Sequence, residues 1–133
     1  MKRLNFLNHY SPVLLAVLRI VAAVLLLSAG LVKLVGFPAG AQPGQMPILS
    51  LLAVAAILEV VGGILLILGL FTRPVAFVLS GEMAVAYWMV HAPKSFFPIL
   101  NQGAPAILFC FIFLYLVAAG PGALSIDSRI ESD

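Results

Sequence analysis

The sequence predicts an all-α integral membrane protein, folded as a four-helix bundle with an up-down-up-down topology. The first observation is composition, since 63% of the 133 residues are hydrophobic, 9% are charged, and the mean hydropathy is +1.18. Soluble domains are typically about a quarter charged. The second is the presence of four apolar segments whose lengths approach the about 20 residues needed to cross a bilayer. The third is that short connections separate these segments, so consecutive helices are expected to pack as antiparallel neighbours in one domain, residues 1–133.

The first two spans are expected at about 12–35 and 47–70. Pro12 suits the opening turn of a helix, and the uncharged Gly/Pro-rich stretch 36–47 ends the first span. The basic N-terminus resembles a signal peptide, but the apolar run that follows exceeds the about 7–15 residues of a signal core. The sequence therefore predicts an uncleaved first span.

The last two spans are expected at about 74–91 and 105–119. A tight connection, Phe71-Thr72-Arg73-Pro74, leads into the third span, and the fourth ends at Gly120-Pro121-Gly122. The fourth span is the shortest and lies at or just below the low end of spanning length. Lys and Arg residues in the loops set orientation, because they concentrate on the cytoplasmic side. That rule predicts that both termini are cytoplasmic, with these basic residues on the cytoplasmic side: Lys2, Arg3, Arg73 and Arg129.

A carboxylate lies at the centre of the second span. Small residues three and four positions away share its helical face: Ala55, Ala56, Gly62 and Gly63. Such a face suits contact with other helices, because an uncompensated charge at the bilayer centre costs about 2.5–3.5 kcal/mol on insertion scales. Glu59 is this carboxylate, and it therefore requires a partner inside the bundle.

Three charged residues are expected to form a buried charge cluster. At about 1.5 Å of rise per residue, Arg19, Glu82 and Glu59 lie roughly 10, 12 and 16 Å from the cytoplasmic ends of their spans. The estimate predicts that Arg19 pairs with Glu82, Glu59 or both, and Tyr87 and Ser80 are candidate donors to an unpaired acid. The cluster either fixes helix register only or forms a proton, quinone or solute site, and the sequence leaves both readings open.

A second group is expected at the outer surface, and its members are Lys33, His91, Lys94 and Asn101. His91 suits proton transfer near neutral pH, although a lone interfacial His is more often a membrane anchor. One His without a nearby carboxylate is too few ligands for a metal, so no metal site is predicted. Cys110 is the only cysteine, which excludes an internal disulfide and a thiolate metal cage. The net charge of +2 gives no basic stripe, which excludes nucleic acid as a partner.

Several stretches in order along nearly the whole chain resemble the DoxX family of small bacterial membrane proteins. They are Leu18-Arg19-Ile20, Lys33-Leu34-Val35-Gly36-Phe37-Pro38, Leu58-Glu59-Val60-Val61-Gly62-Gly63, Leu68-Gly69-Leu70-Phe71-Thr72-Arg73, Glu82-Met83-Ala84-Val85-Ala86-Tyr87, His91-Ala92-Pro93, Gly120-Pro121-Gly122 and Ser125-Ile126-Asp127. The resemblance implies a multi-pass protein of the bacterial inner membrane. The family's fourth helix usually opens Asn-Gly-Gly-Glu, whereas this chain reads Asn101-Gln102-Gly103-Ala104-Pro105. The acidic residue is absent here, which argues against a catalytic outer site.

The resemblance implies a membrane subunit or anchor that works with a redox partner linked to quinones or to sulfur and thiol chemistry. Two alternatives stay open: a small solute or proton transporter that uses the buried charges, and a purely structural or lipid-binding bundle. The residues form no self-sufficient catalytic site. The sequence therefore favours a protein that is not an enzyme, and both classes stay open. No cofactor is evident, and a bound quinone or lipid is the ligand to look for. The expected partners are the lipid bilayer, a soluble oxidoreductase and a second copy of the chain.

Overall fold

The structure is a computed structural model that describes residues 2–35 and 51–132. Within those ranges every regular element is helical, which confirms the all-α class. The elements are η1 (Lys2–Tyr10), α1 (Ser11–Val35), α2 (Leu51–Leu68), α3 (Thr72–Ala86), η2 (Tyr87–His91), η3 (Ala92–Lys94), α4 (Pro98–Asn101), α5 (Ala104–Ala119) and α6 (Ile126–Ser132). The predicted start of the second span, residues 47–50, lies outside the described residues.

In the part of the chain that the structure describes, three continuous helical segments are long and apolar enough to cross a membrane: Arg3–Val35, Leu51–Leu68 and Thr72–Lys94. The last of these is α3 extended by the π-helical turn η2 and the 3-10 turn η3. The shorter α5 has the same apolar character, with 16 residues. The predicted third span, about 74–91, is shorter than the segment Thr72–Lys94, because η2 and η3 continue the helix of α3 as far as Lys94.

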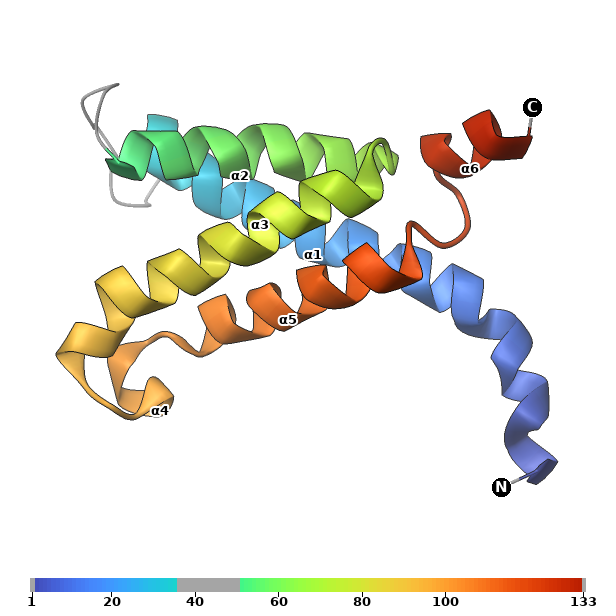
Figure 1. Cartoon of the computed structure of the whole chain (residues 1–133), viewed down its shortest axis with the longest axis horizontal. Coiled ribbons are helices and arrows are strands. Elements are labelled where there is room, and N and C mark those ends of the chain that lie inside the picture. The colour runs from blue at the N-terminus through green and yellow to red at the C-terminus, as the bar shows by residue number, and fades with distance from the viewer. Residues whose placement is uncertain (1, 36–50, 133) are drawn as a thin grey trace.

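The helices form two side-by-side pairs, α1 with α2 and α3 with α5 (Figure 1). Both chain ends and α6 lie at one end of the molecule, on the right of Figure 1, and this is called the termini end. The other end carries the short helix α4 and is called the α4 end. The two pairs approach each other at the termini end and diverge toward the α4 end.

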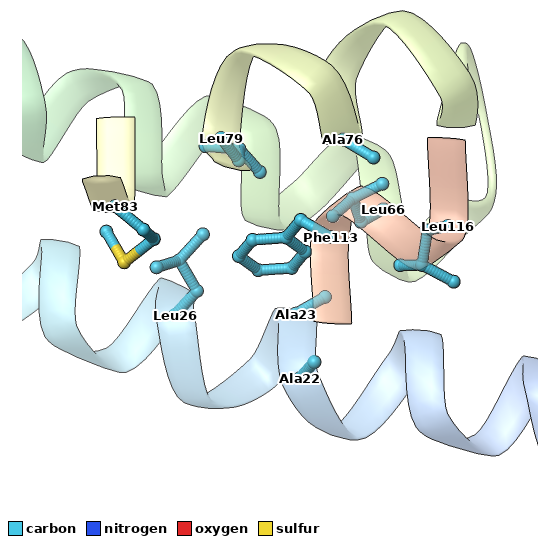
Figure 2. Close-up of a cluster of buried hydrophobic side chains, with 9 residues drawn as sticks. All are labelled: Ala22, Ala23, Leu26, Leu66, Ala76, Leu79, Met83, Phe113 and Leu116. Atoms are coloured by element: carbon cyan, nitrogen blue, oxygen red, sulfur yellow. The ribbon is translucent and has the colours of Figure 1, made fainter. Parts of the chain in front are cut away.

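The buried core joins both pairs (Figure 2). Its side chains are Ala22, Ala23 and Leu26 from α1, Leu66 from α2, Ala76, Leu79 and Met83 from α3, and Phe113 and Leu116 from α5. Small residues allow this contact, because helices associate in lipid through close van der Waals packing. A Cβ atom at Gly62 would lie 2.8 Å from Leu79 Cδ1, and one at Gly63 would lie 3.0 Å from Leu27 Cβ. The small-residue face of α2 therefore packs between α1 and α3, as its spacing predicts.

Candidate functional site

Arg19 does not pair with either buried acid, so the expected ion pair is wrong. Its side chain is 0% exposed and donates hydrogen bonds to four backbone carbonyl groups. Nε donates to Leu66 O over 2.9 Å, and Nη2 donates to Leu124 O over 2.9 Å. Nη1 donates to the carbonyl oxygens of Pro121 and Ala123. The guanidinium thus holds the segment after α5 against the end of α2.

The start of α3 and the turn before it also bond to α6 and to the end of α5. The Asp127 carboxylate accepts hydrogen bonds of 2.8 Å from the backbone N–H groups of Phe71 and Thr72, at the start of α3. Arg73 Nη1 donates to the carbonyl oxygens of Val117 and Ala118, at the end of α5. These contacts and those of Arg19 are together called the termini clasp.

Asp127 acts as an N-terminal cap for α3. Burial by itself raises the pKa of Asp127, but hydrogen bonds from Thr72 and Phe71 and the charge of Arg19 outweigh it, so the pKa lies below its usual range. A carboxylate at a helix N-terminus also interacts favourably with the helix dipole. The charged form of Asp127 therefore stabilises the turn between α2 and α3.

The partner of Glu59 is Lys33. Lys33 Nζ lies 2.7 Å from Glu59 Oε1 and 2.8 Å from Oε2, joining α1 to α2. The Glu59 side chain is 1% exposed and that of Lys33 is 32% exposed. Sequence reasoning assigned Lys33 to the outer surface, but its long side chain reaches inward from the last turn of α1.

Glu82 on α3 lies near this pair. Both of its carboxylate oxygens are buried, and neither has a hydrogen-bond partner among residues 2–35 and 51–132. The negative charge of Glu59 and the positive charge of Lys33 both act on Glu82. Lys33, Glu59 and Glu82 are together called the ion cluster. It differs from the predicted charge cluster in its base, which is Lys33 in place of Arg19.

The predicted outer-face group is brought together only in part. His91 Nδ1 is 2.9 Å from Asn101 O, and Asn101 Nδ2 donates to Ser95 O over 2.9 Å and to the Tyr87 hydroxyl over 3.2 Å. Asn101 is 0% exposed and organises this network. Lys33 belongs to the ion cluster instead, and Lys94 is exposed on η3.

Two suggested donors to the acids have other roles. Ser80 Oγ donates to Cys110 O over 2.8 Å, which joins α3 to α5. Tyr87 bonds to Asn101 rather than to Glu82. Sequence reasoning also missed Asp127 and the carbonyl groups around Pro121, although the motifs Gly120-Pro121-Gly122 and Ser125-Ile126-Asp127 were noted. These two motifs were the available sequence signal for the C-terminal contacts. Nothing in them identified Arg19 as the residue that bonds to this segment.

The helices and the ion cluster define a multi-pass helical membrane protein with charged residues paired inside its membrane domain. The DoxX family profile matches residues 14–92, and the chain belongs to the DoxX family. The chain is 45% identical over 130 residues to an uncharacterized protein of Haemophilus influenzae, covering 95% of this chain and 97% of the relative. It is 32% identical over 129 residues to the inner membrane protein YphA of Escherichia coli, covering 89% and 91%. No solved structure matches.

Membership of this family and the apolar helices place the chain in the bacterial inner membrane as a multi-pass protein. Lipid therefore surrounds its helices. This setting matters for the ion cluster, because polar groups that face lipid are costly, whereas the cluster joins helices within the protein.

Proposed function

We propose that this protein is a membrane subunit or anchor that works with a redox partner, linked to quinones or to sulfur and thiol chemistry. In this proposal four helices cross the membrane in up-down-up-down order, with both termini in the cytoplasm. The proposal takes its setting from the DoxX family and its site from the ion cluster. The observation that carries it is the buried Glu82 carboxyl group, which has no hydrogen-bond partner among the described residues.

A buried polar group without a partner destabilises a protein by about 1–3 kcal/mol, and by more when it is charged. Ionisable residues inside a membrane domain are accordingly functional-site candidates. Glu82 can accept a hydrogen bond or a proton from a hydroxyl or thiol group of a ligand. Oxidation of a hydroquinone or of a thiol releases protons, so a redox subunit in the membrane needs such an acceptor.

The Lys33–Glu59 ion pair forms a fixed part of the environment of this proton acceptor, the Glu82 carboxyl group. Lys33 bonds to both oxygens of Glu59, so Glu59 is occupied, while the buried Glu82 carboxyl group is unpaired among the described residues. The pair is thus the positioning element of the site, and Glu82 is the residue that would meet the ligand.

The test is native purification of the tagged chain from bacterial membranes in mild detergent. We expect an oxidoreductase to co-purify and the redox turnover of the assembly to fall at least tenfold in Glu82→Gln. The matched control is Glu131→Gln, an exposed carboxyl group near the C-terminus, which should leave turnover unchanged. A wild-type chain that retains no oxidoreductase contradicts the proposal, as does full turnover in Glu82→Gln. Solute or proton leak in proteoliposomes, lost in Glu59→Gln, would support the transporter alternative instead.

A further inference from the structure

A groove between α3 and α5 at the α4 end has the size of a ligand site. Its volume is about 700 Å³, within the range of about 300–1,000 Å³ that is typical of small-molecule pockets. Aromatic and apolar side chains dominate its lining, including Tyr87, Trp88, Phe96, Ile107, Cys110 and Phe111. None of the ion-cluster residues lines it, so this groove is a separate place on the molecule.

The groove lies beside an irregular turn of backbone. Tyr87 and Trp88 begin the π-helical turn η2, and their rings meet edge to face with centroids 5.4 Å apart. π-Helical turns are rare and are frequent at functional sites. Gly103 permits the arrangement, because a Cβ atom there would lie 2.5 Å from the Tyr87 ring. The helix and the connection that follows it therefore shape this aromatic wall together.

The buried side-chain amide of Asn101 determines which hydrogen bonds the Tyr87 hydroxyl can form. The N–H of Gly103 donates to Asn101 Oδ1 over 2.8 Å, which identifies the other amide atom as the nitrogen donor. That nitrogen donates to the Tyr87 hydroxyl oxygen and to Ser95 O. The hydroxyl of Tyr87 is thus an acceptor toward Asn101, and its own proton has no acceptor among the described residues. A tyrosine in this state can donate a hydrogen bond to a ligand.

We propose that the α3–α5 groove binds a flat, uncharged, lipid-soluble aromatic molecule with a carbonyl oxygen, which accepts a hydrogen bond from Tyr87. The aromatic lining favours stacking of a flat ring over an acyl chain. The donor at Tyr87 selects a ligand with an acceptor oxygen. Asn101 is a positioning residue, because it acts on the ligand through Tyr87. Quinones belong to this chemical class, so the inference adds a site beyond the ion cluster and rests on the proposed function only for the identity of the natural ligand.

Trp88 is the only tryptophan of the chain and lines the groove, so its fluorescence reports on binding. The purified full chain in nanodiscs is titrated with 2-methyl-1,4-naphthoquinone and, separately, with 2-methylnaphthalene, which has no carbonyl oxygen. We expect saturable quenching by the naphthoquinone and an affinity loss of about three- to tenfold in Tyr87→Phe, as one neutral hydrogen bond predicts. The matched control is Tyr115→Phe, since Tyr115 lies outside this groove and should not affect binding.

Quenching that does not saturate would overturn the inference, as would equal affinities of wild type and Tyr87→Phe for the naphthoquinone. If 2-methylnaphthalene binds wild type as tightly as the naphthoquinone does, the groove takes any apolar molecule and the inference is wrong. This comparison uses the wild-type chain alone, so it holds even if Tyr87→Phe folds poorly. The titration involves no oxidoreductase, so its outcome is independent of whether a redox partner co-purifies.

Discussion

The charged groups of the termini clasp are all hydrogen-bonded, whereas Tyr87 and Glu82, farther from that end, keep an unpaired polar group among the described residues. At the termini end, Arg19 meets four carbonyl groups and Asp127 meets two N–H groups. At the end where the helix pairs diverge, Tyr87 has a proton without an acceptor among the described residues. Nearer the middle of α3, the Glu82 carboxyl group lacks a partner in the same part of the chain. The Thr72 hydroxyl at the termini end also lacks a partner among the described residues, so the contrast concerns the charged groups, and those of the termini clasp are all hydrogen-bonded.

The largest expected effect is at Arg19. Arg19→Met removes a buried charged donor and leaves several carbonyl groups without it, so the free energy of unfolding should fall by about 3–5 kcal/mol. Thermal unfolding in detergent micelles measures this change. The control is Arg3→Met, because Arg3 is exposed on η1 and should change stability little. Equal stability of the two variants would show that the termini clasp does not hold the fold together.

The second effect concerns the Lys33–Glu59 pair. Lys33→Met or Glu59→Met alone should each destabilise the protein by about 2 kcal/mol, below the usual range for buried pairs, because the Lys33 side chain is 32% exposed. The double variant should lose less than the sum of both, because it leaves no unpaired charge. A double-mutant cycle of thermal unfolding checks this coupling, with Lys94→Met as the exposed control. Additive losses would mean that the two side chains do not interact.

Replacement of Glu82 should change the free energy of unfolding in the opposite direction. Glu82→Leu removes a buried carboxyl group that lacks a partner among the described residues, so we expect the free energy of unfolding to rise by about 1 kcal/mol or to stay unchanged. The comparison with Arg19→Met is the sharpest contrast between the clasp and the ion cluster. A loss of more than about 1 kcal/mol in the same unfolding assay would indicate that Glu82 already has a structural partner.

The smallest effect is the pH response of Asp127. Its pKa is lowered in the folded protein, so its stabilising contribution is present above the unfolded value of about 3.9 and is lost as pH falls through the folded pKa. Asp127→Asn should cost about 0.5–1 kcal/mol at pH 7, as for a helix cap. The gap between wild type and this variant should narrow below about pH 4. Unfolding is compared from pH 7 to pH 3 with Glu131→Gln as the control, and a gap independent of pH would contradict the capping role.

Helix periodicity and residue type predicted the packing face of α2. The small residues around Glu59 predicted a face that packs against other helices, and Gly62 and Gly63 contact α3 and α1. The spacing also predicted that Glu59 has a basic partner inside the protein. The choice of Arg19 was wrong, because estimated depths ignored side-chain reach and the carbonyl groups that a folded C-terminal segment supplies. Arg19 and Lys33 are about 21 Å apart along one helix, so the choice between them changes which level of the protein is charged.

The sequence by itself determined the all-α class, the apolar spans, the DoxX family and the need to pair Glu59 inside the protein. These depend on composition, periodicity and motifs, which are local properties of the chain. Only the tertiary structure decided that Lys33 pairs with Glu59, that Arg19 fastens the segment after α5, and that Asn101 bonds to the Tyr87 hydroxyl. The physical reason is that a hydrogen bond requires its atoms to lie within about 3 Å, and the packing of distant segments sets that distance.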